Sequence, residues 1–201
     1  ISHDLQTPIT RMRLRVDVMD ESPQHAKLQQ DLQEMETLVK EGVAYARTLH
    51  GAAEAPIRID PDALLDSLVC DYVDAGKEVS LHGAVGVALV TRPQALKRIL
   101  GNLVDNALKF SGAAELEVGV QADGAVTIAV LDRGPGIPAE SLEAVFEPFV
   151  RLEASRNRNT GGTGLGLAIA RQLTLAMDAK LSLHNRAGGG LEARLTLRPQ
   201  R

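Results

Sequence analysis

Three separated segments dominate this sequence: NLVDNALK at residues 102–109, DRGPG at residues 132–136 and GTGLG at residues 162–166. Together they supply amide oxygens for a cation, a carboxylate for the edge of a base and glycine-rich loops for phosphates. A lone glycine pattern arises often by chance, whereas three such segments in this order rarely do. They predict one nucleotide-binding site assembled from three parts of the chain.

The first segment lies in a helix predicted over residues 93–110. Asn102, Asn106 and Lys109 are four and three residues apart, so they share one face of that helix. Amide oxygens suit magnesium, which prefers oxygen ligands and keeps waters and substrate phosphates, and Lys109 would offset phosphate charge. Taken alone, the same face is better explained as a solvated helix surface.

The second segment follows a strand predicted over residues 125–132. The Asp132 carboxylate can accept a hydrogen bond from an exocyclic amino group, which favours adenine over guanine, and Gly134 and Gly136 let the backbone approach a planar base. In isolation the segment is also simply a good turn.

The third segment, with Gly162, Gly164 and Gly166, directly precedes a helix predicted over residues 164–177. Free backbone amides and the helix dipole would then face an anion, as in a phosphate cradle. Its spacing differs from that of the common P-loop, and no strand precedes it as a dinucleotide-binding fingerprint requires.

Around these segments, short strands alternate with helices from residue 57 onward. A further helix is predicted over residues 61–75, and strands over residues 87–90, 115–121, 180–185 and 191–197. This order predicts an α+β domain over residues 57–201, with helices on one face of a mainly antiparallel sheet. The single cysteine, Cys70, lies in an apolar run and is predicted to be a small buried hydrophobe.

The first fifty residues have a different period. Apolar residues recur four and three apart over residues 5–19 and again over residues 28–49, with a turn expected around Pro23. We therefore expect a helical hairpin at residues 1–50 and a linker of small residues at 51–56. Two helices bury little surface, so a homodimer would complete a four-helix bundle, unless the apolar seams pack on the rest of the chain.

Composition excludes some functions. The net charge of -4 gives no general attraction for nucleic acid, and one cysteine cannot form an internal disulfide. No apolar run approaches the roughly 20 residues of a membrane helix. We expect a cytoplasmic fragment that reaches the cell membrane only through a segment upstream in a longer parent protein.

The motifs and their order resemble the catalytic core of the two-component sensor histidine kinases of bacteria. Residues 102–109 are similar to the N box of that family, 132–136 to its G1 box, FEPF at 146–149 to its F box and 162–166 to its G2 box. SHDLQTP at residues 2–8 resembles the H box. The resemblance implies a dimerisation and phosphotransfer hairpin followed by a Bergerat-type α/β sandwich that binds ATP, with a lid at about 150–162.

The same resemblance assigns the chemistry. It implies that His3 takes the γ-phosphoryl group of ATP and passes it to an aspartate in the receiver domain of a response regulator. Asp4 would orient the imidazole or act as a base, and an acid-x-x-Thr pattern ending at Thr7 is associated in this family with dephosphorylating the regulator.

In the ATP site, the resemblance implies Asn106 as the Mg²⁺ ligand, assisted by Asn102 and Lys109, and Asp132 as the adenine contact. A lid arginine would contact phosphate, and the candidates are Arg151, Arg156 and Arg158.

Two alternatives stay open. Another ATPase of the same superfamily, of the chaperone or mismatch-repair type, would explain the nucleotide motifs but not the H box. A catalytically silent dimeric scaffold with a vestigial ATP site would retain every motif.

Overall fold

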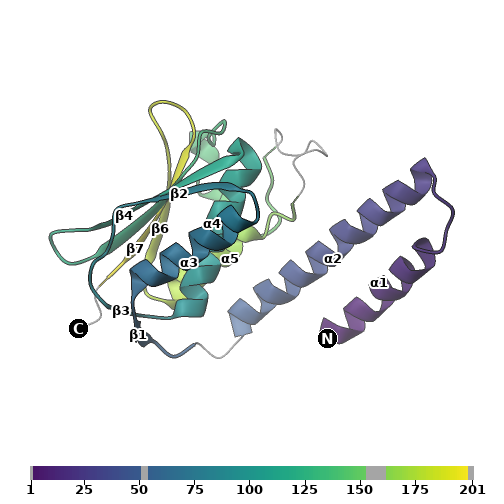
Figure 1. Cartoon of the computed structure of the whole chain (residues 1–201), viewed down its shortest axis with the longest axis horizontal. Coiled ribbons are helices and arrows are strands. Elements are labelled where there is room, and N and C mark those ends of the chain that lie inside the picture. The colour runs from purple at the N-terminus through teal and green to yellow at the C-terminus, as the bar shows by residue number, and fades with distance from the viewer. Residues whose placement is uncertain (1, 51–53, 153–161, 199–201) are drawn as a thin grey trace.

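The structure is a computed structural model that describes residues 2–50, 54–152 and 162–198. Two antiparallel helices, α1 (Ser2–Val16) and α2 (Pro23–His50), form the predicted hairpin (Figure 1). Ile9, Val16 and Leu32 are buried between them, with Val39 packed alongside. The Ser22 hydroxyl accepts a hydrogen bond from the backbone N–H of His25 at 3.0 Å, which caps the start of α2.

The rest of the described chain is the mixed domain. Its helices are α3 (Pro61–Asp74), α4 (Pro93–Ser111) and α5 (Gly166–Ala176), with short 3₁₀ turns η1 (Ala139–Ser141) and η2 (Ala144–Phe146). Its strands are β1 (Ile57–Ile59), β2 (Glu78–His82), β3 (Leu89–Thr91), β4 (Ala113–Val120), β5 (Val126–Leu131), β6 (Lys180–Asn185) and β7 (Leu191–Leu197).

Five strands form one sheet in the order β2-β4-β5-β7-β6, and β1 pairs separately with β3. The sheet is antiparallel except where β2 runs parallel to β4, so the predicted mainly antiparallel sheet is confirmed. Sequence reasoning missed β2, because five residues with a single alternation of Val79 and Leu81 do not separate a strand from a loop.

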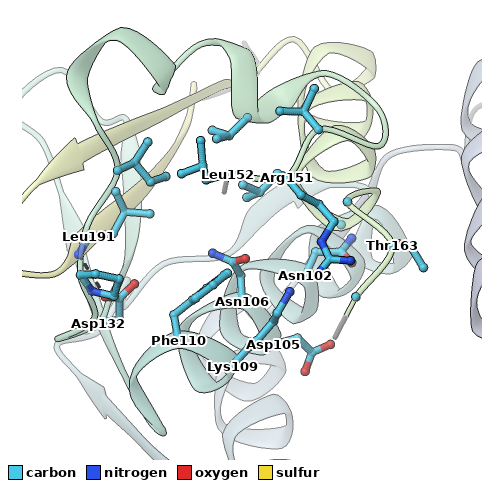
Figure 2. A pocket seen from close by; sticks show the side chains of 18 of the residues that line it. Asn102, Asp105, Asn106, Lys109, Phe110, Asp132, Arg151, Leu152, Thr163 and Leu191 are labelled. Carbon is cyan, nitrogen blue, oxygen red and sulfur yellow. Dashed lines mark hydrogen bonds between the residues drawn. The ribbon is translucent and has the colours of Figure 1, made fainter. Parts of the chain in front are cut away.

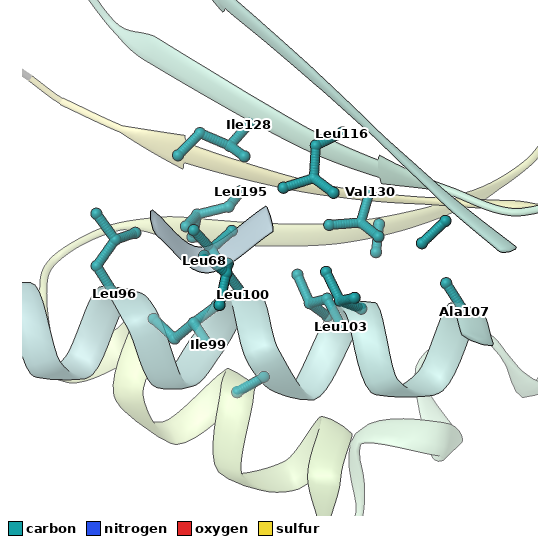
Figure 3. Packing of buried hydrophobic residues seen from close by; sticks show 14 of the residues in the cluster. Leu68, Leu96, Ile99, Leu100, Leu103, Ala107, Leu116, Ile128, Val130 and Leu195 are labelled. Atoms are coloured by element: carbon teal, nitrogen blue, oxygen red, sulfur yellow. The ribbon is translucent and has the colours of Figure 1, made fainter. Parts of the chain in front are cut away.

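Helices α3, α4 and α5 cover one face of the sheet (Figure 1). The buried row of α4, which includes Leu96, Leu100 and Leu103, packs against sheet residues such as Ile128 and Leu195 (Figure 3). Burying one side of α4 in this way fixes the direction of its other side, which carries the polar residues of the first segment.

The prediction that Cys70 is buried is wrong, because its side chain is exposed. Helix α3 turns Leu65 and Leu68 toward the core, and Cys70 lies two residues further on, about 200° around the helix. In the described part of the chain, no helix combines the length and the apolar character that a bilayer crossing requires.

Candidate nucleotide-binding site

A pocket of about 400 Å³ opens between α4, the loop after β5 and the segment that leads into α5 (Figure 2). It has a volume typical of small-molecule sites. The pocket brings together the predicted binding residues Asn102, Asn106, Lys109, Asp132, Gly136, Arg151, Gly162, Gly164 and Gly166. Gly134 lies just behind the lining, where its N–H supports Asp132.

One end of the pocket is apolar with a single carboxylate. Asp132 is 7% exposed, and its Oδ1 accepts hydrogen bonds from the N–H of Gly134 at 2.7 Å and of Leu191 at 3.1 Å. Both bonds go to Oδ1, so Oδ2 is left for a ligand. Ile137 and Leu191 add apolar lining. A carboxylate oxygen beside apolar walls suits a flat base with an amino group.

Two contacts hold this end in shape. The Asn185 amide accepts from the N–H of Ile137 at 2.9 Å and donates to the Ile137 carbonyl at 2.6 Å, which ties the loop after β5 to β6. Gly190 has a φ of 96°, and a Cβ there would lie 2.0 Å from the Asp132 carbonyl oxygen. Only glycine fits this approach of the β6–β7 turn to Asp132.

The polar face of α4 forms the middle of the pocket, where Figure 2 places Asn106 between Asp132 and Arg151. The Nδ2 atom of Asn102 is buried and has no hydrogen-bond partner within the described structure. A buried amide without a partner is costly unless a ligand satisfies it. The amide oxygens of Asn102 and Asn106 are the kind of ligand that fits a magnesium ion held mainly by phosphates and water.

The other end of the pocket carries positive charge. Partial burial lowers the pKa of Lys109, the nearby Arg151 guanidinium lowers it further, and Glu41 acts in the opposite direction. Two neighbouring cations that repel each other favour a bound anion. The N-terminus of α5 lies beside them, since Gly166, its first residue, lines the same pocket.

The third segment folds tightly at this end. Gly164 has a φ of 74°, and a Cβ there would lie 2.9 Å from the Val150 carbonyl oxygen. The N–H of Phe149 donates to the Gly164 carbonyl at 3.0 Å. The two ends of the predicted lid therefore meet at the pocket. Of the predicted lid at about 150–162, residues 153–161 with Arg156 and Arg158 lie outside the described residues, so Arg151 is the candidate lid arginine that the structure describes.

Sequence reasoning missed several lining residues. Phe110 and Asp105 are next to predicted residues in the sequence, and that proximity could have revealed them. The Tyr72 hydroxyl donates to Asp105 at 2.7 Å, and its pKa is raised by burial first and then by this carboxylate. Leu191 and Glu41 have no local sequence signal, because strand register and packing of the hairpin bring them to the pocket.

The predicted catalytic residues His3, Asp4 and Thr7 lie in the first turns of α1. The side chains of His3 and Asp4 are outside the described residues. Thr7 is exposed and is not part of the pocket lining. The structure therefore places the predicted acceptor and the pocket on separate parts of the chain.

Comparison with known proteins agrees with this geometry. Residues 91–201 match the family described as histidine kinase-, DNA gyrase B-, and HSP90-like ATPase. The chain is 40% identical to sensor histidine kinase GtrS of Pseudomonas aeruginosa over 201 residues, and 34% identical to sensor protein RstB of Escherichia coli over 197 residues. These alignments cover 98% and 94% of this chain, and 40% and 45% of the two relatives.

Solved structures are similar as well. Full-length ShkA in complex with AMPPNP superposes with a TM-score of 0.75 at 25% identity, over 98% of this chain and 44% of that one. Acinetobacter baumannii histidine kinase AdeS superposes over the whole of both chains with a TM-score of 0.69 at 21% identity, which shows the shared fold.

The chain spans less than half the length of these two curated relatives. Both alignments nevertheless include the N-terminal hairpin, which an ATPase domain alone would lack. The chain therefore belongs to the histidine kinase-, DNA gyrase B- and HSP90-like ATPase family, and its similarity to sensor histidine kinases extends over the helical hairpin as well as the ATPase domain.

Proposed function

We propose that this chain is the catalytic core of a protein histidine kinase, which transfers the γ-phosphoryl group of ATP to His3 and then to an aspartate of a response regulator. One observation carries the proposal. A single pocket combines a base-reading carboxylate, Asp132, with a cationic end at Lys109 and Arg151, in a chain whose separate hairpin presents the His3-Asp4 pair.

Each of these residues has a separate role in binding ATP or in the transfer. Asp132 accepts from the adenine amino group, and Lys109 and Arg151 neutralise the phosphates. Magnesium, held by Asn106 with Asn102 nearby, would spread the charge of the transferred group. A neutral imidazole at His3 is nucleophilic near neutral pH, and Asp4 can hydrogen-bond one ring nitrogen and leave the other to attack phosphorus. Phosphoryl transfer depends mainly on placement and charge neutralisation, which these residues supply.

The proposal includes partners. Two hairpins form a four-helix bundle in a homodimer, and a receiver domain docks beside His3 to collect the phosphoryl group. Thr7, one turn from His3, orients a water for an opposing activity, in which that water hydrolyses the aspartyl phosphate of the regulator and releases inorganic phosphate. The core works on the cytoplasmic side of a membrane-anchored parent, where ATP is available.

Radiolabelled ATP tests the proposal. The 201-residue chain is incubated with γ-labelled ATP and Mg²⁺, and the label should be stable to alkali, labile to acid and absent from His3→Gln. His184→Gln is the matched control, because His184 is exposed on β6 and should leave labelling unchanged. ATP binding without any label in the wild-type chain would favour the silent scaffold instead. Steady release of phosphate from ATP by both the wild-type chain and His3→Gln would favour another ATPase of the superfamily.

A further inference from the structure

Glu41 connects the hairpin to the nucleotide pocket. It lies on α2, yet its half-buried side chain reaches the pocket, and it is the one pocket residue that the described part of the hairpin contributes. Its Oε2 accepts a hydrogen bond from the Thr163 hydroxyl of the glycine-rich segment. A negative charge from one domain thus sits in the binding site of the other.

The Glu41 carboxylate is surrounded by the kinds of group that bind a phosphate, namely a hydroxyl donor and nearby cations. Thr163 also accepts from the N–H of Leu165 at 3.2 Å, so its hydroxyl is fixed at the entrance to α5. Lys109 is close enough that the charge of Glu41 stabilises its ammonium form, against the effect of Arg151. The Thr163 hydroxyl that contacts the Glu41 carboxylate, the Lys109 ammonium near it and the Arg151 guanidinium near Lys109 together form a site for an oxyanion.

We propose that Glu41 is an internal competitor of the terminal phosphate of ATP, and that its contact with Thr163 holds the ATP domain against the hairpin until nucleotide displaces it. The inference rests on the proposed function, in that the ligand is ATP. Glu41 and a terminal phosphate are both anions that seek the same donors, so the two repel each other and only one can occupy this end of the pocket.

This competition has a consequence for the mobile ATP domain that transfer to His3 requires. In the ligand-free chain the carboxylate satisfies Thr163 and offsets the charge of Lys109. When ATP binds, its phosphates take over those contacts, and α2 loses a tie to the domain. The ATP domain has two states, held to α2 by the Glu41–Thr163 contact or released from it. Because ATP binds the released state more tightly, ATP binding shifts the domain toward release.

The test measures nucleotide affinity by titration calorimetry in the full 201-residue chain. Glu41→Gln keeps the size of the side chain and removes its charge. We expect ATP to bind this variant about tenfold more tightly, which corresponds to roughly 1.4 kcal/mol of binding free energy. ADP lacks the terminal phosphate, so its affinity should change much less. Glu41→Asp, which keeps the charge, should stay closer to wild type than Glu41→Gln.

Glu34→Gln is the matched control, because Glu34 lies on the same helix, is exposed and accepts a hydrogen bond from the Gln30 amide, away from the pocket lining. It should leave both affinities unchanged. Unchanged or weaker ATP binding by Glu41→Gln would overturn the inference, as would an equal gain for ATP and ADP. A wild-type chain that binds no ATP contradicts the proposed function itself, whereas a wild-type chain that binds ATP as tightly as Glu41→Gln contradicts only the role of Glu41.

Discussion

At the residue scale, Asp132 shows how one carboxylate serves structure and recognition together. Oδ1 accepts two backbone hydrogen bonds that shape the pocket, while Oδ2 is available to the base. The sequence placed this residue correctly at the end of a strand. It could not indicate that the Leu191 N–H, from the far side of the β6–β7 turn, would be one of the donors, because that depends on strand register.

Asp132→Asn should weaken ATP binding by about 10- to 100-fold, because a hydrogen bond to a charged acceptor contributes roughly 1.5–3 kcal/mol. Calorimetric titration measures the change. Asp123→Asn provides the comparison, since Asp123 also accepts one backbone N–H in a turn, at 3.0 Å from Ala125, but lies outside the pocket. Equal affinities for wild type and Asp132→Asn would remove Asp132 from base recognition.

The lowered pKa of Lys109 should make the stability of the chain depend on pH. Its pKa in the folded chain is below the ordinary 10.5. Between these two pKa values the unfolded chain binds more protons than the folded chain, so stability should rise with pH across that window. Thermal unfolding at a series of alkaline pH values should show this rise in wild type relative to Lys109→Gln. Parallel profiles for the two proteins would show that Lys109 titrates normally.

At the element scale, α4 was the best-predicted part of the chain, because its proline start, its apolar row and its polar face all agree. The prediction that Cys70 is buried is wrong because the apolar run around it belongs to α3, whose helical phase turns Cys70 away from the core. Burial of the seam residues Met12 and Leu28 also could not be settled from the sequence. Their side chains are 40% exposed within one chain, since two helices cover only part of each other.

The start of α4 has an unexpected cap. Arg92 at the N-cap makes no capping hydrogen bond with its side chain, and the linker residue Glu54 instead accepts from the N–H groups of Gln94 and Ala95, both at 3.1 Å. Glu54→Ala should lower the free energy of unfolding by about 1 kcal/mol, the usual effect of losing a cap, and Glu54→Gln by less. Urea unfolding measures both. Glu140→Ala, at an exposed glutamate outside α4, is the control, and an equal loss there would contradict the capping role.

At the scale of the whole molecule, the hairpin needs a partner surface. Met35, a residue of the apolar seam, is 43% exposed, and the hairpin also exposes the apolar side chains of Leu14 and Leu38, by 63% and 43%. The ATP domain covers little of the apolar seam of the hairpin. The buried cluster of the seam contains residues of the hairpin only. A second hairpin would cover it.

Sedimentation equilibrium should therefore find a dimer at micromolar concentration, and Leu38→Glu should shift it to monomer, because each dimer would bury two unpaired charges. Val87→Glu is the matched control, since Val87 is 61% exposed on the ATP domain and should leave the dimer intact. A wild-type chain that sediments strictly as a monomer would contradict the proposed four-helix bundle.

In the proposed function, ATP held in the pocket donates its γ-phosphoryl group to His3 on the hairpin. The most direct measurement compares ATP labelled at the γ-phosphate with ATP labelled at the α-phosphate, followed by mapping of the modified residue by mass spectrometry. We predict stable incorporation from γ-labelled ATP only, on His3, with loss of the signal in His3→Gln and a reduced rate in Asp132→Asn at low ATP. Modification at a different residue, or ATP binding with no incorporation at all, would contradict the account.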